Sequence, residues 1–268
     1  MNLRLTVEYD GTEFSGFQWQ PGLRTVAGTL EGALGTLFEE PIKITGAGRT
    51  DAGVHASGQV VSFAARRGVP LERLAVALNA LLPRDCAVRD AAEVGEDFSA
   101  RFSALERTYV YAVSNQRERS AVLGRYAYHV ARPLDLEAMR AAAACLVGEH
   151  DFQAFVAGSA GVSIRSITRL AIEPRGRLLR IEVAAAAFLR HMVRAVVGAV
   201  LECGSGRRSV RELAEGLQTN RPVGAPTAPA RGLFLAGVRY DGYDSFAEPA
   251  PFGPGAGRHA LTGLAPFP

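Results

Sequence analysis

The order in which strand-like and helix-like segments follow one another limits the fold of this chain more than any other feature. Segments whose apolar residues alternate are strand candidates, and segments whose apolar residues recur every three or four positions are helix candidates. The first six occur as strand, helix, strand, strand, helix, strand, at residues 3–9, 26–37, 41–45, 59–64, 70–81 and 86–94. This order is typical of a ferredoxin-like split β-α-β unit, whose helices cover one face of an antiparallel sheet.

The second half of the chain repeats this order with one added helix. Asp135 and the Ser209–Glu212 pair are helix-start signals within it. The strand candidates are residues 107–114, 165–173, 178–184 and 233–240, and the helix candidates are residues 135–146, 188–202 and a short one after Ser209. An α+β fold with two ferredoxin-like (β-α-β-β-α-β) units is therefore expected.

The expected domain boundaries follow from the gaps between these segments. The N-terminal domain is expected to span residues 1–100, with the catalytic loop, and the C-terminal domain residues 101–246. A tail of residues 247–268 follows, and its last twenty residues hold five prolines and four glycines. Such a composition predicts a loosely held or disordered segment.

Composition and charge narrow the class of protein. With 48% hydrophobic and 21% charged residues among 268, a soluble globular chain with a sizeable core is expected. The net charge of +3 excludes a polybasic tail but is compatible with a basic patch on one face. Lys43 is the only lysine, so such a patch would consist of arginine, whose planar guanidinium can donate two hydrogen bonds to one phosphate. A general arginine bias would give the same count.

Other classes are excluded by what the sequence lacks. The three cysteines, Cys86, Cys145 and Cys203, are far apart, so neither a disulfide framework nor a zinc site is expected. The most apolar stretch, residues 183–201, is interrupted by charged residues, and the N-terminus resembles no signal peptide. We therefore expect a cytoplasmic protein with no membrane association.

The glycine-rich stretch GAGRTDAGVHASGQVV, residues 46–61, is the strongest candidate for chemistry. A dinucleotide fingerprint would need glycine where Asp51 stands, and a phosphate-binding P-loop would need lysine where Val54 stands. The glycines instead allow sharp turns and the close approach of a large ligand. Asp51 is then a carboxylate on a rigid loop, two residues after Arg49. The residues alone equally fit an Asx turn with a surface ion pair.

This stretch resembles the signature of the tRNA pseudouridine synthase A family, in which the aspartate is the nucleophile. Five further segments resemble motifs of that family, in the family's order, and the resemblance covers roughly residues 3–245. They are YDGTEFSGFQWQ (9–20), LNALLP (78–83), FSARFSALERTYVYAV (98–113), AFLRHMVRAVVG (187–198) and RGLFLAGVRY near the end.

The resemblance implies a fold, a reaction and partners. The fold is two ferredoxin-like domains that share a central, mainly antiparallel sheet and pair as a homodimer. The reaction is the conversion of uridine to pseudouridine at positions 38, 39 and 40 in the anticodon stem-loop of tRNA, by an aspartate nucleophile and base flipping. This isomerisation needs neither a cofactor nor a metal.

The resemblance also implies roles for individual residues. Asp51 is the nucleophile. Three reactions of its carboxylate remain possible: attack on C1′, attack on C6 of the uracil, or removal of a ribose proton. A carboxylate in a dry pocket stays charged only beside a cation, and Arg194 in the family's H-M-V-R motif is the candidate. Tyr109 stacks on the target uracil, and Arg49 fills the space that the flipped uridine leaves. The other proposed substrate-binding residues are His55, expected to bond within the loop, and Asn79, expected to tie neighbouring backbone.

An arginine-rich surface is expected to bind the RNA backbone. Residues 174–211 hold eight arginines and two glutamates. Further candidates for phosphate contacts are Arg66, Arg67, Arg84, Arg117 and Arg119. Where the family has an S-R-T/S-P-x-R segment, this chain has GVSIR at 161–165, which puts local RNA contacts there in question.

Two other functions remain open on the sequence. Ferredoxin-like sheets commonly bind single-stranded RNA, so an RNA-binding module without catalysis is one alternative. An enzyme that uses the glycine-rich loop to bind the phosphate of a small molecule is the other, although the P-loop and dinucleotide spacings speak against it. Replacing Asp51 by asparagine distinguishes the first alternative from an enzyme, because only an enzyme would lose isomerisation and keep its tRNA binding.

Overall fold

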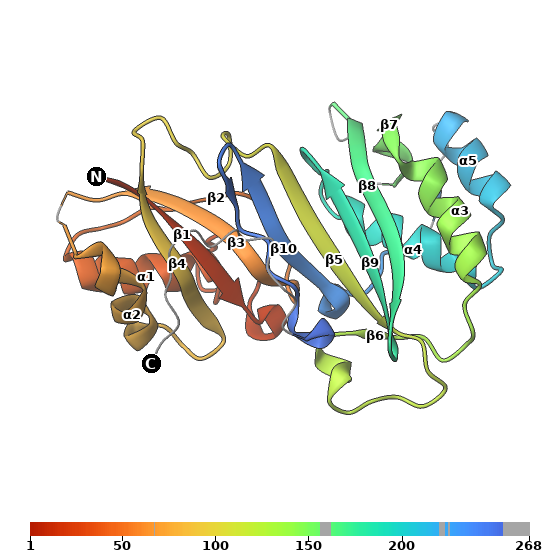
Figure 1. Ribbon diagram of the computed structural model, residues 1–268, viewed down its shortest axis with the longest axis horizontal. Coiled ribbons are helices and arrows are strands. Elements are labelled where there is room, and N and C mark those ends of the chain that lie inside the picture. The colour runs from red at the N-terminus through yellow and green to blue at the C-terminus, as the bar shows by residue number, and fades with distance from the viewer. Residues whose placement is uncertain (67, 156–161, 220–222, 225, 254–268) are drawn as a thin grey trace.

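The computed structural model describes residues 1–66, 68–155, 162–219, 223–224 and 226–253, which form a mixed α+β fold around one large sheet (Figure 1). The helices are α1 (Val26–Phe38), α2 (Leu71–Leu81), α3 (Leu136–Leu146), α4 (Met192–Gly204) and α5 (Val210–Thr219). The strands are β1 (Asn2–Tyr9), β2 (Thr45–Gly46), β3 (His55–Ala64), β4 (Cys86–Val94), β5 (Glu106–Ser114), β6 (Tyr128–His129), β7 (Gly148–Asp151), β8 (Ile164–Arg175), β9 (Leu178–Ala185), β10 (Leu233–Tyr240) and β11 (Tyr243–Asp244). The main strand order is β4-β1-β3-β10-β5-β9-β8-β7, with β2 and β10 both beside β3.

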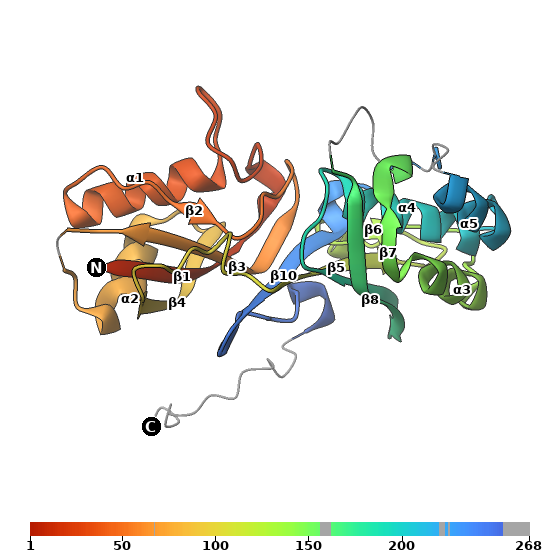
Figure 2. The same ribbon diagram turned by 90° about the horizontal axis from the view of Figure 1, so that it is seen from above.

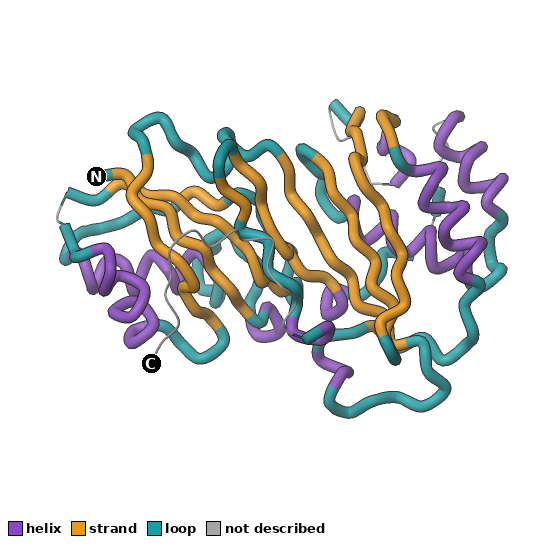
Figure 3. Tube along the Cα trace, viewed as in Figure 1, coloured by secondary structure: helices purple, strands orange, loops and turns teal. Residues whose placement is uncertain are grey.

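The helices gather in two groups at opposite ends of this sheet (Figure 3). In the first half of the chain, α1 packs against α2, and the strands run in the order β4-β1-β3-β2. Helix α1 forms because Thr25 caps it, its side chain accepting from the backbone N–H of Gly28, and because apolar residues recur every four positions. The buried residues of that series are Val26, Leu30, Leu34 and Phe38.

The second half has the corresponding order of long strands, β10-β5-β9-β8, with α3, α4 and α5 packed at its end of the sheet. The predicted cap at Asp135 is confirmed, since its carboxylate accepts from the backbone N–H groups of Glu137 and Ala138. The predicted capping box before α5 also forms: Ser209 and Glu212 hydrogen-bond each other through side chain and backbone. Local sequence signals therefore fix where these two helices begin.

The two halves are joined through the middle of the sheet by β10. This strand lies antiparallel to β5 and parallel to β3, and the parallel pairing comprises Phe234 opposite His55 and Leu235 opposite Ala56. Seen from above, the helices of the two halves form two lobes on either side of this junction (Figure 2). Any group that bridges the lobes must therefore lie close to β3, β5 and β10.

Three predicted elements differ from the structure at their ends. The strand predicted from residue 59 already begins at His55. The predicted strand at residues 41–45 is a strand only from Thr45, because Ile42 packs into the core while Glu31 of α1 accepts from Lys43 Nζ and from the Ile44 backbone N–H. The helix predicted from residue 188 begins at Met192, because His191 adopts a left-handed backbone conformation with φ of 61°.

Two other expectations on local structure need correction. The short strand β7, which pairs with β8, was not predicted, because its sequence GEHD carries no apolar alternation. The described part of the segment predicted to be loose, residues 249–253, is ordered instead: it contains the short helix η5 (Ala250–Phe252), and Phe252 packs against a buried cluster of Val110, Ala236 and Phe246. Residues 254–268 of that tail lie outside the described residues. No helix in the described part of the chain is both long and apolar enough to cross a bilayer.

Candidate active site

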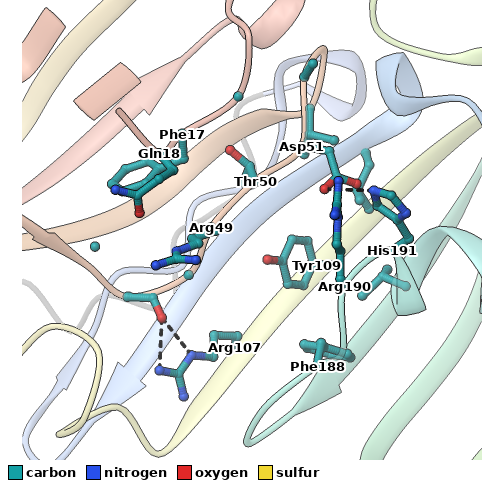
Figure 4. A pocket seen from close by; sticks show the side chains of 18 of the residues that line it. Phe17, Gln18, Arg49, Thr50, Asp51, Arg107, Tyr109, Phe188, Arg190 and His191 are labelled. Atoms are coloured by element: carbon teal, nitrogen blue, oxygen red, sulfur yellow. Dashed lines mark hydrogen bonds and ion pairs between the residues drawn. The ribbon is translucent and has the colours of Figure 1, made fainter. Parts of the chain in front are cut away.

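A cavity of about 1040 Å³ lies where the two lobes meet, and its walls come from segments far apart in the sequence (Figure 4). One wall is the glycine-rich loop between β2 and β3, together with residues 15–18 and Gln20. The opposite wall is the segment that leads into α4, and strand β5 contributes Tyr109. The charged or ionisable side chains that line it include Arg49, Asp51, Arg101, Arg107, Tyr109, Arg165, Arg190, His191 and Arg194.

The loop that carries Asp51 is held by hydrogen bonds to the residues just before it. Gln59 of β3 donates from its side-chain amide to the Gly48 carbonyl at 2.7 Å. The Tyr9 and Thr50 hydroxyls are 2.8 Å apart, and the Phe17 backbone N–H donates to the Thr50 carbonyl. These contacts place the Asp51 backbone rigidly at the cavity wall, which is what a reacting group requires.

Glycine is required where a second segment passes behind this loop. Gly11 lies so close to the loop that a Cβ built on it would stand 1.9 Å from the Val54 carbonyl oxygen. Gly16 has φ of 93°, and a Cβ there would stand 3.0 Å from the Thr50 carbonyl oxygen. The backbone beneath Asp51 is therefore packed against glycines that no other residue could replace without movement.

The Asp51 carboxylate is paired with groups from the other half of the chain. Arg194 Nη1 lies 2.9 Å from Asp51 Oδ2, and Arg194 Nε donates to the Ala228 carbonyl at 2.8 Å, which fixes the guanidinium plane. Sequence analysis named this arginine, and the structure brings it to Asp51. The Asp51 side chain keeps 27% of its exposure, so a carboxylate held by a cation still faces the cavity.

His191 is a second partner of Asp51 that sequence reasoning missed. Its Nε2 lies 3.4 Å from Asp51 Oδ1. The left-handed conformation at His191, just before α4 begins, places the imidazole at the cavity wall (Figure 4). The signal was present in the quoted segment AFLRHMVRAVVG, where the histidine stands three residues before Arg194.

Tyr109 contributes an aromatic wall near the carboxylate. Its ring is 8% exposed and packs edge-on against Phe188, with ring centres 5.3 Å apart. Its phenol group lines the cavity and makes no hydrogen bond to any described residue (Figure 4). Burial, and next the charge of Asp51, raise the pKa of this phenol above its ordinary value, so it stays neutral at pH 7.

The cavity carries more positive charge than its own carboxylates balance. Arg49, Arg101 and Arg190 line it and have no carboxylate partner in the described part of the chain, and Arg49 and Arg190 are exposed. Arg107 is held differently, because both Nε and Nη2 donate to the Ala47 carbonyl. A cavity with several unpaired guanidinium groups suits a phosphate-bearing ligand.

His55 does not reach the cavity. Its Nδ1 accepts from the Gly11 backbone N–H at 3.0 Å, its Nε2 is 3.2 Å from the Arg231 carbonyl, and its ring stacks on Phe234. Burial lowers the pKa of this imidazole. His55 is thus a buried link between the segment after β1, strand β3 and the second half. It was expected to bond within the loop, but its partners lie outside the loop, and it does not line the cavity.

Asn79 also lies away from the cavity. Its side-chain amide donates to the Val88 carbonyl at 2.8 Å and accepts from the Val88 N–H at 2.7 Å. The residue therefore ties α2 to β4, because both hydrogen-bonding groups of its side chain are used on one backbone position. This geometry fits the expected backbone role and offers nothing to a substrate in the cavity.

The predicted arginine-rich RNA surface is smaller than its sequence suggests. Of the eight arginines in residues 174–211, five pair with carboxylates: Arg175, Arg180, Arg194, Arg208 and Arg211. Arg177, Arg190 and Arg207 have no carboxylate partner among the residues that the structure describes.

The other candidates for phosphate contacts are not part of the cavity wall: Arg66, Arg84, Arg117 and Arg119 do not line it. Arg67 lies outside the described residues, as does the start of GVSIR at residue 161. Arg165 of that segment lines the cavity and donates to two backbone carbonyls.

No group of three or more His, Cys, Asp or Glu side chains is placed to hold a metal ion in the described ranges.

Asp10 joins the two lobes beneath the loop. Its carboxylate accepts from Arg125 Nε at 2.6 Å and from the Tyr126 hydroxyl at 2.9 Å, and it lies 3.1 Å from His55 Nδ1. Burial alone would raise the pKa of Asp10. Hydrogen bonds from Thr12 and Tyr126 and the nearby His55 outweigh this effect and lower the pKa to about 2. The folded protein therefore stabilises the charged form of this carboxyl.

Replacing Asp10 by asparagine is expected to lower the free energy of unfolding by about 1–2 kcal/mol at pH 7. The folded pKa of about 2 lies below the ordinary aspartate value of 3.8, so this stabilisation is complete above about pH 4. This stabilisation should be lost as the pH falls through about 2, so the free energies of unfolding of the two proteins should then become equal. Urea unfolding of both proteins from pH 7 to pH 2 measures this. Asp241→Asn, on an exposed turn, should match the wild type at pH 7. A difference in the free energy of unfolding between wild type and Asp10→Asn that stays constant down to pH 2 would contradict this interpretation.

Comparison with known proteins identifies the family. The model of the tRNA pseudouridine synthase family matches residues 5–103 and 142–241. Proteins named tRNA pseudouridine synthase A are 45% identical over 242 residues in Myxococcus xanthus and 40% identical over 242 residues in Acetivibrio thermocellus. The matches cover 89% of this chain in both cases, and 91% and 99% of those proteins. A relative of the same name in Halalkalibacterium halodurans is 43% identical, covering 85% of this chain and 89% of that protein. With its cavity, its paired carboxylate and these matches, the chain belongs to the tRNA pseudouridine synthase family, a family of isomerases.

Proposed function

We propose that this chain converts uridine to pseudouridine in tRNA, with Asp51 as the nucleophile. The observation that carries the proposal is the Asp51–Arg194 ion pair at the wall of a cavity lined by Tyr109 and unpaired arginines. Arg194 holds Oδ2 at 2.9 Å, and Oδ1, which has the longer contact of 3.4 Å with His191, is the oxygen that we propose reacts. The curated relatives, which are named for this activity, support the same assignment.

The reaction rearranges bonds within one nucleoside. The N1–C1′ bond breaks and its electron pair leaves with the base, the base turns, and C5 supplies the electron pair of the new C5–C1′ bond. The proton on C5 is then lost, and N1 takes up a proton. Atoms and electrons balance without oxidation or hydrolysis. The carboxylate of Asp51 assists because it stabilises or traps the fragment that forms when the first bond breaks.

Tyr109 is proposed to stack on the uracil and to help remove the C5 proton. A neutral phenol accepts that proton only while it passes its own proton onward, for instance to water in the cavity. The edge-on contact with Phe188 holds the ring in position, and its hydroxyl is free of other bonds to described residues.

Two substitutions separate these roles of Tyr109. Tyr109→Phe keeps the ring, so tRNA binding should match the wild type while turnover falls by about 10²–10⁴-fold. Tyr109→Leu removes the ring as well, and tRNA binding should weaken further by about tenfold, since base stacking contributes about 1–3 kcal/mol. Filter binding and single-turnover kinetics measure the two effects. Full turnover by Tyr109→Phe would show that the phenol hydroxyl has no part in proton removal.

The finer features of the activity are part of the same proposal. The target uridine flips out of the anticodon stem-loop at position 38, 39 or 40, and Arg49, which is exposed at the cavity, fills the space it leaves. Residues 1–100 and 101–246 act as two ferredoxin-like domains in a cytoplasmic homodimer, without a cofactor. The matching strand orders of the two halves, β4-β1-β3-β2 and β10-β5-β9-β8, support the division into domains.

Release of tritium from tRNA transcribed with C5-labelled uridine tests the proposed function. The wild type should release tritium equivalent to about three sites at most per tRNA, and transcripts with cytidine at positions 38, 39 and 40 should release none. Binding of tRNA without tritium release would instead favour an RNA-binding module. Tritium release from transcripts without uridine at those positions would support the proposed activity but would show that positions 38, 39 and 40 are not its targets.

A further inference from the structure

Trp19 stands at the rim of the cavity with half of its side chain exposed. It is the only tryptophan of the chain and is 51% exposed. Its neighbours Phe17, Gln18 and Gln20 line the cavity, whereas Trp19 itself does not. The segment between η1 (Gly11–Glu13) and α1, coloured red to orange-red, stands out beyond its lobe in Figure 2. The indole is therefore beside the cavity, outside its walls.

The segment that presents Trp19 is closed by its own hydrogen bonds. The Ser15 backbone N–H donates to the Arg24 carbonyl at 2.8 Å, and the Gln20 side-chain amide donates to the Ser15 carbonyl at 3.1 Å. The Val26 backbone N–H donates to the Gly16 carbonyl, which ties the segment to the start of α1. A loop ordered before binding loses little conformational entropy when a ligand arrives.

The indole ring is itself held in place. A Cβ built on Gly28 of α1 would stand 3.2 Å from Trp19 Cδ1, so the ring packs on a helix position without a side chain. Lys43 Nζ, which pairs with Glu31 at 2.8 Å, lies 5.7 Å from the ring centre. One part of the indole is thus fixed against α1, and the remainder faces solvent as a rigid aromatic surface with a cation nearby.

We infer that Trp19 is a stacking platform for an unpaired base of the RNA substrate, next to the uridine that enters the cavity. This inference rests on the proposed function and adds a binding residue to it. The unpaired guanidinium groups of Arg49, Arg101 and Arg190 attract a phosphate backbone to the cavity. A strand bound there would carry its neighbouring bases past the rim, where an exposed aromatic ring can stack on any base.

The exposed surface around Trp19 suits a nucleotide better than a protein. On this segment the only other large exposed apolar side chain is Leu23, among the residues that the structure describes. Specific protein interfaces bury about 800 Å² on each partner, far more than two side chains offer. Gln18 and Gln20, the exposed polar residues that flank Trp19 in the sequence, are also unlike the apolar centre of a stable dimer interface.

Intrinsic fluorescence tests this inference directly, because a single tryptophan gives the whole signal. Addition of a substrate tRNA transcript to the wild type should quench the emission excited at 295 nm, since a stacked base quenches indole. The quench should saturate at the tRNA concentration found by filter binding. The control is the double variant Trp19→Phe/Val76→Trp, whose tryptophan lies on α2, away from the cavity, and should respond only through light absorption by the RNA.

Kinetics with two variants supply the second measurement. Trp19→Phe keeps an aromatic face, so its kcat and KM should match those of the wild type. Trp19→Leu keeps an apolar side chain without that face and should raise KM by about tenfold with kcat unchanged, the loss expected for one stacked base. A merely structural tryptophan would not distinguish phenylalanine from leucine in this way.

The outcomes separate this inference from the proposed function. Two results would show that Trp19 is not a stacking platform while the enzyme assignment stands. In both, the wild type forms pseudouridine, but either tRNA leaves the tryptophan emission unchanged or Trp19→Leu has the same KM as the wild type. If the wild type forms no pseudouridine, the proposed function fails first. Emission that changes with protein concentration in the absence of RNA would place a second copy of the chain on Trp19 and overturn the inference.

Discussion

Replacement of Asp51 by asparagine is expected to abolish pseudouridine formation and to leave tRNA binding intact. The amide is nearly the same size but is a poor nucleophile, so turnover should fall by about 10⁴-fold or more, as for other enzymes that lose their nucleophile. Binding should persist because phosphate contacts come from the arginines of the cavity. The loop should also stay in place, since its hydrogen bonds involve Gly48 and Thr50 rather than the carboxylate.

Single-turnover tritium release and filter binding of the same tRNA measure these two expectations. The matched control is Asp90→Asn, a half-exposed aspartate that pairs with Arg4 on β1 and lies outside the cavity. It should retain full turnover. Asp51→Asn with turnover within tenfold of the wild type would remove Asp51 from the chemistry. Loss of tRNA binding in parallel with turnover would assign it a role in binding instead.

Replacement of Arg194 by alanine is expected to give the second largest loss. Arg194 Nη1 balances the charge of Asp51 at 2.9 Å, and its Nε holds the Ala228 carbonyl. Without the guanidinium, the carboxylate has only His191 as a nearby partner among the described residues, so it loses both its fixed orientation and its counter-charge. Turnover should fall by about 10²–10³-fold, the usual cost of removing one preorganised charge partner. Thermal stability should fall modestly, because the side chain is 18% exposed and its ion pair is partly buried.

Arg194→Lys and Arg211→Ala complete this experiment. Lysine restores a positive charge without the fork that binds both Asp51 and Ala228, so it should recover part of the turnover. Arg211 forms an exposed ion pair with Glu215 on α5, and its removal should change neither turnover nor stability by more than a small amount. Turnover of Arg194→Ala near that of the wild type would show that the ion pair does not serve the reaction.

Elements with strong local signals could be predicted from the sequence, and elements that depend on tertiary contacts could not. The caps at Asp135 and Ser209 and the four-residue repeat of α1 act within a few residues of the chain, and the structure confirms all three. The predicted strand at residues 41–45 failed because Glu31, ten or more residues away, takes over the hydrogen bonds of that segment. The late start of α4 depends on the left-handed residue His191, for which no propensity gives a signal.

The same division holds for the site. Asp51 could be singled out from its glycine-rich surroundings, but Arg194 is 143 positions away, and only the family resemblance connected the two. His191 was missed because its contact with Asp51 follows from one unusual backbone angle. His55 and Asn79 were assigned to the substrate because they stand in motif segments, although such segments also hold residues that keep the backbone in place.

The position of β10 determines when during synthesis this protein can become functional. The strand that lies between β3 and β5 is made after every other long strand, so a nascent chain holds its sheet in two separate pieces until residue 240 has left the ribosome. Each piece can fold as it emerges, and we expect Asp51 and Arg194 to meet only when β10 is inserted between β3 and β5. We therefore expect an incomplete chain to be inactive on the RNA that surrounds it during translation.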